Sequence, residues 1–305
     1  MLETLLVLWI LSAIPILTGH NILKMVIYLG IYSLITAIIL LVFGAPDVAL
    51  AEASVSIFST IFFIVCFKKY YQLAPDPKII KLGKYMLPLG FTALLVVAFL
   101  HFAPDFDAST YAMEQYIAHF ARDIGGQNAV TSIYLGYRLY DTIFEALMLM
   151  ISVTAISRLS WYEGTIANQE IKPIKLSEQT VKIIRVISPL LPLFSIYLIA
   201  NGHITAGGGF QGGVVLATFF VCRYLTLNIN DLPVKRIIRS EKLVFASIVL
   251  FSLLGVFSAV NIYVPANFIP TLQNIFLITM NALIGAKVTF SFILLFYRFI
   301  AIEDE

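Results

Sequence analysis

Charged residues are scarce in this sequence of 305 residues: they make up 12% of it, whereas an ordinary soluble domain carries about 25%. The formal net charge of +2 is too small and too dispersed for nucleic-acid binding, which excludes that class of function. Hydrophobic residues make up 60%, and the mean hydropathy is +0.91. This composition predicts a multi-pass protein of a lipid bilayer.

Cysteine is almost missing as well. Cys66 and Cys222 lie in separate apolar runs, and neither has a second Cys or a His at ligand spacing. Disulfides, zinc sites and iron–sulfur clusters are therefore unsupported, and we expect no metal, no bound cofactor and no catalytic centre. A basic N-terminal region is also lacking, because the chain begins Met1-Leu2-Glu3, so we expect the first apolar run to be a retained span.

Long apolar runs are what the sequence has in abundance. A run crosses a bilayer if it holds about 20 residues at 1.5 Å per residue. Nine runs qualify, at 3–19, 22–43, 47–67, 84–103, 135–157, 184–203, 210–228, 242–261 and 273–297. Lys and Arg gather in three of the connections, 68–84, 158–183 and 229–242, and the alternate connections hold only Arg122. The sequence therefore predicts an all-α protein of about nine transmembrane helices, with its N-terminus outside and its C-terminus cytoplasmic.

Ionisable residues inside a span are costly, and the fifth span carries three of them. Arg138, Asp141 and Glu145 fall within about 60° of one helix face, and Glu145 lies about 15 Å into the membrane if the helix enters near Leu135. One interpretation places these side chains on an ion pathway. The alternative is that Arg138 neutralises Asp141 near the surface and Glu145 is a protonated packing residue.

Other ionisable groups also fall within or beside apolar runs. Asp47 and Glu52 begin the third span, where Asp47 could be a helix cap only and Glu52 lies deeper. Lys287 lies inside the last span, so we expect either a lost proton or a carboxylate from another span or chain facing it. The two interpretations of Lys287 are a role in a proton pathway and a static ion pair. His203 at a span end is either a hydrogen-bonding residue or a proton carrier.

A glycine-rich segment separates the sixth and seventh spans. Residues 207–212 match the dinucleotide pattern G-x-G-x-x-G, but that pattern functions between a strand and a helix, and here it joins two apolar runs. Small residues at every fourth position instead predict close helix packing. These residues are Gly209, Gly213 and Ala217 in one series and Gly208 and Gly212 in a second.

Three parts of the chain resemble known families. The stretch 188–217, with Asn201-Gly202-His203 and Gly207-Gly208-Gly209-Phe210-Gln211-Gly212-Gly213, closely resembles the MrpB-type component of the Mrp multisubunit Na⁺/H⁺ antiporters. Residues 1–72, with Ala45-Pro46-Asp47-Val48-Ala49-Leu50-Ala51-Glu52, are similar to the small D component of membrane-bound hydrogenases. Residues 84–165, with Tyr137-Arg138-Leu139-Tyr140-Asp141, are similar to the adjacent E component. We therefore expect three domains, 1–72, 84–165 and 180–305.

These resemblances imply a subunit of a cation/proton antiporter in the cell membrane. The partners implied are complex-I-like antiporter subunits and small Mrp C, F and G subunits, and the ions are H⁺ and Na⁺. Glu52, Asp141 and Glu145 are then the expected carriers, with Lys287 as a charge partner. Two alternatives stay open: the same module in a redox-driven membrane complex, and a scaffold that conducts no ions.

Overall fold

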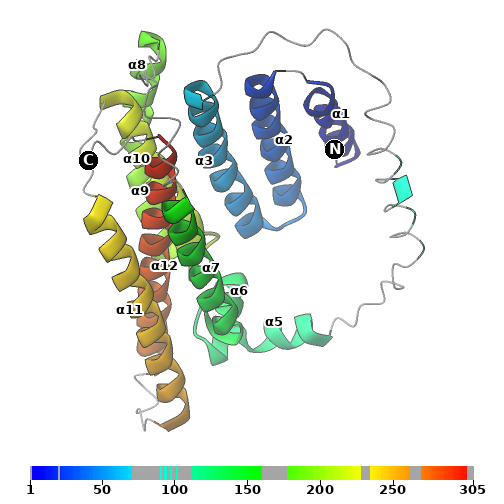
Figure 1. Ribbon diagram of the computed structural model, residues 1–305. Coiled ribbons are helices and arrows are strands. Elements are labelled where there is room, and N and C mark those ends of the chain that lie inside the picture. The colour runs from blue at the N-terminus through cyan, green and yellow to red at the C-terminus, as the bar shows by residue number, and fades with distance from the viewer. Residues whose placement is uncertain are drawn as a thin grey trace.

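The chain forms a bundle of helices, seen in Figure 1. The computed structural model describes residues 2–19, 21–70, 111–159, 177–227, 234–261 and 269–300, together with positions 90, 93, 94, 97 and 101. These residues contain helices and turns and no strand. The expected fourth span, 84–103, therefore lies almost wholly outside the described residues.

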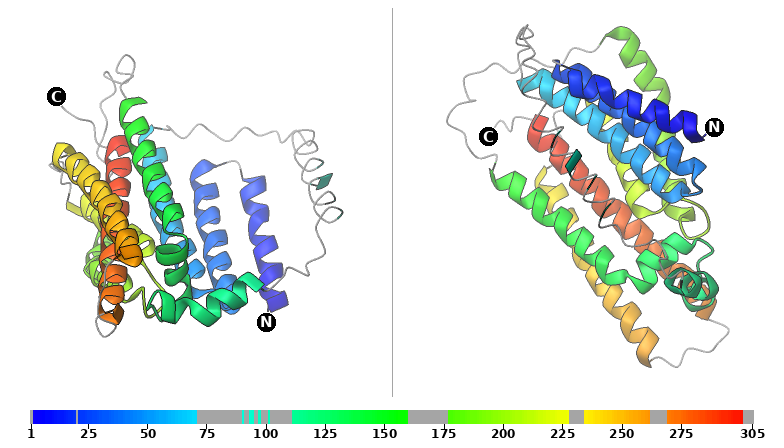
Figure 2. Two further views of the ribbon diagram at one scale, coloured as in Figure 1. Left: turned by 90° about the horizontal axis from the view of Figure 1, so that it is seen from below. Right: turned by 90° about the vertical axis from the view of Figure 1, so that its right-hand side faces the viewer.

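The first three helices form one layer. They are α1 (Leu2–Thr18), α2 (Ile22–Val42) and α3 (Pro46–Tyr70). Asn21 caps α2, since its side chain accepts hydrogen bonds from two backbone N–H groups of the first turn. Gly44 has a φ of 76° in the turn before α3, and Pro46 occupies the first helical position, where its missing N–H costs nothing. Figure 2 shows the three helices in a row, and α3 contacts the rest of the bundle through α10 and α12.

From residue 111 onward, the middle of the chain begins with a helix at a place where the sequence predicts a connection. It comprises α5 (Tyr111–Asp123), α6 (Ala129–Ser132), a π-helix (Ile133–Tyr137) and α7 (Leu139–Leu159). α5 crosses the end of the bundle in Figure 1. Arg138 has φ −114° and ψ 32°, so the expected continuous helix 135–157 is wrong: a π-turn precedes Arg138, and α7 begins one residue after it.

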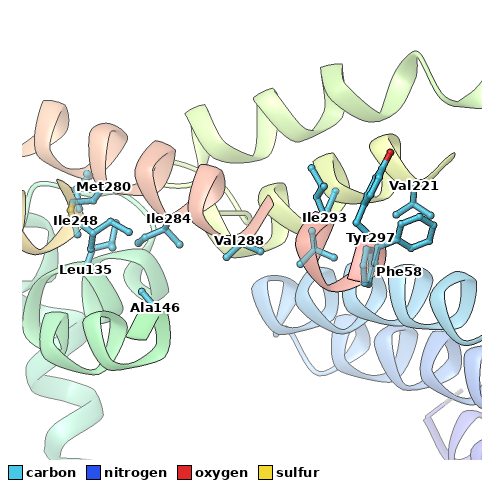
Figure 3. Packing of buried hydrophobic residues seen from close by; sticks show 14 of the residues in the cluster. Phe58, Leu135, Ala146, Val221, Ile248, Met280, Ile284, Val288, Ile293 and Tyr297 are labelled. Atoms are coloured by element: carbon cyan, nitrogen blue, oxygen red, sulfur yellow. The ribbon is translucent and has the colours of Figure 1, made fainter. Parts of the chain in front are cut away.

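The described residues of the last part of the chain, from 177 onward, form five helices. They are α8 (Glu178–Ile187), α9 (Leu190–Asn201), α10 (Gly209–Leu227), α11 (Val234–Asn261) and α12 (Ile269–Ile300). The expected span 184–203 lies within one apolar segment, Glu178–Asn201, that is divided into α8 and α9 at Pro189, which lacks the N–H that would continue α8. α12 lies at the centre and contacts α3, α7, α9, α10 and α11. Figure 3 shows its apolar residues Met280, Ile284, Val288, Ile293 and Tyr297. They face side chains such as Ala146 of α7 and Phe58 of α3.

Five helical segments among the described residues are long and apolar enough to cross a membrane. They are Ile22–Val42, Pro46–Phe67, Leu139–Ile156, Glu178–Asn201 and Leu272–Phe299, and Glu3–Thr18 is a shorter apolar helix. The chain is therefore a helical, multi-pass membrane protein. The count of nine spans and the sides of the two termini stay predictions.

Candidate functional site

A pocket of about 250 Å³ lies among α3, α7, α10 and α12. Its apolar lining includes Ala146, Ile284 and Val288, which lie close together in Figure 3. Its polar lining consists of Asp47, Tyr134, Thr142, Glu145, Gln211 and Lys287. At about 30 Å³ of liquid volume per water molecule, this space has room for several waters or a partly hydrated ion.

Three ionisable residues from distant parts of the sequence meet at this pocket. Asp47 comes from α3, Glu145 from α7 and Lys287 from α12. Charged groups within a membrane are tolerated where they pair or line water, and this pocket supplies such a place. Within the parts of the chain that the structure describes, no three His, Cys, Asp or Glu side chains gather to hold a metal ion.

Asp47 is held by neutral donors. The residue is 7% exposed, and its Oδ1 accepts hydrogen bonds from Asn128 Nδ2 at 2.9 Å and from the Gly207 backbone N–H at 3.1 Å. Its own backbone carbonyl accepts a bond from Gln211 Nε2 at 3.4 Å. Asp47 therefore ties the glycine segment to the start of α3.

Asn128 connects the three parts of the chain. Its Oδ1 accepts from the N–H groups of Val130 and Thr131, which makes it the cap of α6. Its Nδ2 donates to Asp47 and also to the carbonyl oxygens of Gly202, at 3.2 Å, and Thr205, at 2.9 Å. The amide orientation is thus fixed on both sides. Sequence reasoning missed this residue, although an Asn just before a helical segment is the usual sign of a cap.

Glu145 lines the pocket from the edge of α7 that is exposed on this chain. Its neighbours Thr142 and Ala146 are buried, whereas Glu145 itself is exposed on this chain. The Thr142 hydroxyl donates to the Tyr134 carbonyl at 2.6 Å and so fixes α7 against the π-helix that precedes it. The Glu145 carboxylate therefore borders both the pocket and the outer surface of the chain.

Lys287 forms an ion pair with a carboxylate from another helix. The partner is Glu241 of α11, and the two side chains are 0% and 3% exposed. A carboxylate facing Lys287 was one of the two outcomes expected from the sequence, although Glu241 was not among the expected residues. Glu241 has basic residues as its sequence neighbours. It nevertheless shares a buried helix face with Ile248, seven residues further on, and with Ser252, four residues beyond Ile248.

The remaining expected site residues lie outside the pocket lining. Glu52 accepts a hydrogen bond from Ser33 of α2. Arg138 and Asp141 form an ion pair of 2.5 Å, with side chains 64% and 51% exposed, and such exposed pairs stabilise a fold little. His203 is buried, its carbonyl accepts from the N–H groups of Gln127 and Asn128, and its Nδ1 has no partner among the described residues.

The glycines allow close approach between helices. A Cβ on Gly209 would lie 2.4 Å from the Asn281 carbonyl oxygen, and one on Gly213 would lie 2.6 Å from that of Gly285, so both face α12. Gly212 faces α9, and Ala217 is fully buried. Gly208 has a φ of 141°, and a Cβ there would lie 2.5 Å from the Tyr134 hydroxyl. A side chain larger than hydrogen is excluded at these contacts.

Fold and pocket together define a class: a polytopic helical membrane protein with ionisable side chains inside its bundle. Residues 180–303 match the family described as a domain related to the MnhB subunit of Na⁺/H⁺ antiporter, and residues 7–72 match the MbhD family, the D component of MBH. The chain thus carries an MbhD domain followed by an MnhB-related domain.

Curated relatives carry antiporter names. The A component of the Na⁺/H⁺ antiporter of Bacillus subtilis is 25% identical over 158 residues, which is 50% of this chain and 20% of that protein. The putative antiporter protein mnhA2 of Staphylococcus haemolyticus is 29% identical over 150 residues, 49% of this chain and 19% of that protein. The chain therefore spans about a fifth of the length of these relatives.

Two solved structures share the fold. In the Mrp complex from Dietzia sp. DQ12-45-1b, a chain matches with a TM-score of 0.75 and 14% identity, over 99% of this chain and 35% of that one. In a membrane-bound sulfane sulfur reductase, an archaeal respiratory membrane complex, a chain matches with a TM-score of 0.54 and 24% identity, over 74% of this chain and 100% of that one. The helical arrangement is therefore one found in large membrane complexes.

Proposed function

We propose that this chain is a transport subunit of a multisubunit monovalent cation/proton antiporter in the cell membrane, and that its pocket is part of the ion route. The observation that carries the proposal is the meeting of Asp47, Glu145 and Lys287 at one pocket. The MnhB-related domain and the antiporter names of the relatives support it. The partners would be antiporter-like subunits and small subunits of the same complex.

The pocket offers the chemistry that an ion route needs. Glu145 can bind a proton or balance a cation, and the oxygen atoms of Tyr134, Thr142 and Gln211 are ligands that hard cations accept. The Lys287 ammonium is paired with Glu241, so it adds no net positive charge to the pocket, and the two carboxylates leave the pocket attractive to a cation. Asp47, fixed by Asn128 and Gly207, would give the pocket a stationary negative charge.

The test is Glu145→Gln in the complete complex, with Na⁺-dependent proton movement measured in everted membrane vesicles. We expect the exchange rate to fall about tenfold or more, because the amide cannot release a proton and the barrier rises by about 1.4 kcal/mol or more. Glu178→Gln is the matched control, since Glu178 is an exposed acid at the start of α8 and does not line the pocket. Unchanged exchange in an assembled Glu145→Gln complex would contradict the proposal.

A second candidate rests on the match of residues 7–72 to the MbhD family. In this case the same route would work in a complex driven by electron transfer in other subunits. Purification of the intact complex decides between the two: iron–sulfur or nickel subunits favour the redox-driven complex, and their absence favours the stand-alone antiporter. A non-conducting scaffold, the third candidate, predicts normal exchange in the Glu145→Gln variant.

A further inference from the structure

Only one member of the ion pair between α11 and α12 lines the pocket. Lys287 belongs to the pocket lining together with Asp47 and Glu145, whereas Glu241 does not. The Lys287 ammonium nevertheless contacts the Glu241 carboxylate, and both side chains are almost completely buried. Lys287 therefore stands between the pocket and Glu241.

Few further polar contacts surround the pair within the described parts of the chain. Ser291 donates its hydroxyl to Glu241 Oε1 at a long 3.5 Å, and the Phe245 ring centroid lies 5.7 Å from Lys287 Nζ. A buried ionised pair needs good additional hydrogen bonds to offset the loss of water. The ionised form of the pair therefore has few supporting hydrogen bonds, which favours exchange of a proton between its two groups.

Glu241 lies on the side of the pair that is closer to the start of α11. It lies about 10 Å along α11 from the first helical residue, Val234, at a rise of 1.5 Å per residue. The same end of α11 carries Lys235, Arg236 and Arg239, the basic segment for which the sequence predicts a cytoplasmic location. The pair therefore lies between the pocket and the basic end of α11.

We propose that Lys287 and Glu241 form a proton relay that continues the route from the pocket toward the basic end of α11; this rests on the proposed function. The Lys287 ammonium gives a proton to the Glu241 carboxylate, leaving an amine and a carboxylic acid. The amine then takes the proton of protonated Glu145 through water in the pocket, and Glu145 becomes a carboxylate. Glu241 releases its proton at the far side, so one proton has moved and the pair is ionised again.

The relay also determines which ion passes this point. Lys287 stands between the pocket and Glu241, so Na⁺ could pass this point only by displacing the ammonium from its buried ion pair. A proton avoids this barrier because it moves by exchange between the two groups. The step from Lys287 to Glu241 therefore carries H⁺ alone, and Na⁺ that enters the pocket leaves it by another way.

The test replaces both partners with apolar residues of similar size, Glu241→Met with Lys287→Met. Such a replacement of a buried ion pair is often neutral or stabilising, so the complex should assemble and melt as the wild type does. The relay predicts a loss of Na⁺/H⁺ exchange of about tenfold or more in vesicles that contain the assembled complex. Wild-type exchange in this double variant would overturn the relay. Ser252→Ala is the matched control, on the same buried face of α11.

Two single variants keep the relay testable if the double variant fails to assemble. Glu241→Asp retains a carboxylate, whereas Glu241→Gln retains an oxygen that accepts hydrogen bonds from Lys287 and Ser291 but cannot take up and release a proton. The relay predicts substantial exchange with Asp and about tenfold less with Gln at equal complex content, whereas equal exchange in the two would overturn it. Loss of exchange in Glu145→Gln together with normal exchange in the pair variants would leave the proposed function standing and remove the relay alone.

Discussion

The Asn128 side-chain amide donates a hydrogen bond of 2.9 Å to the Asp47 carboxylate, and the two residues belong to different parts of the chain. The same amide nitrogen also donates to the carbonyl oxygens of Gly202 and Thr205, just before the glycine-rich residues 207–212. Asp47 thereby keeps one position at the pocket without a positively charged partner among the described residues.

Asn128→Ala should destabilise the protein by about 2 kcal/mol or more, because it removes a helix cap and leaves buried acceptors without a donor. Asn128→Asp should be at least as harmful, although Asp caps helices well, since it places a second carboxylate beside Asp47. The measurement is the midpoint of thermal unfolding of the purified complex in detergent. A normal midpoint for Asn128→Asp would show that the contact with Asp47 is unimportant.

The glycines of α10 should tolerate no methyl group. We expect Gly209→Ala and Gly213→Ala each to reduce the amount of assembled complex, because the added Cβ would lie 2.4 Å and 2.6 Å from carbonyl oxygens of α12. Gly90→Ala is the control, since a Cβ there meets no atom within 4 Å. Complex content in membranes can be measured by immunoblotting after native electrophoresis. Equal content in all three variants would contradict the close approach of α10 and α12.

Glu52 and Glu145 should differ in importance, although the sequence marks both as carriers. Glu52 is bonded to Ser33 between α2 and α3, whereas Glu145 lines the pocket. We therefore expect Glu52→Gln, which can still accept the bond from Ser33, to retain more Na⁺/H⁺ exchange than Glu145→Gln. The exchange rates of both variants are measured in the same kind of vesicle. A larger loss of exchange in Glu52→Gln than in Glu145→Gln would place the route between α2 and α3.

Asp123, at the end of α5, should titrate unusually low. Hydrogen bonds from Arg122 and from the Tyr137 hydroxyl lower its pKa from the ordinary value of 3.8. Because the folded-state pKa is below the unfolded one, the stabilising contribution is present above pH 3.8 and is lost as the pH falls through the folded value. Tyr137→Phe should therefore lower the thermal midpoint above this window and converge with the wild type below it. A constant difference at every pH would assign the effect of Tyr137 to packing.

Hydropathy was sufficient to predict where most of the described helices lie. The expected seventh span, 210–228, differs from α10 by one residue at each end. The expected helix 135–157 was wrong at Arg138 for a physical reason. Hydropathy averaged over a window does not depend on whether the backbone hydrogen bonds follow the α or the π pattern, so it cannot reveal the π-helix that ends before Arg138. α5 was missed because it is short and amphipathic and holds too few apolar residues to span a membrane.

The pocket depended on contacts that no local pattern contains. Asp47, Glu145 and Lys287 were each recognised as ionisable residues within or beside a span, but their common location follows from how α3, α7 and α12 pack. Glu241 was overlooked because a carboxylate among lysines and arginines is typical of a solvated loop. Its spacing to Ile248 and Ser252 contained the missing information, since that spacing places it on the buried face.

The hydrogen bonds of the Asn128 side chain join three parts of the chain, which bears on how these parts come together in the membrane. It touches Asp47, from the part that matches the MbhD family, and Gly202 and Thr205, from the MnhB-related part, while belonging to neither. Three separate polypeptides would have to be synthesised in equal numbers and find one another in the bilayer before this amide met all its acceptors. Joined in one polypeptide, the three parts have a fixed one-to-one-to-one stoichiometry, and the local concentration of each for the others is set by the linkers.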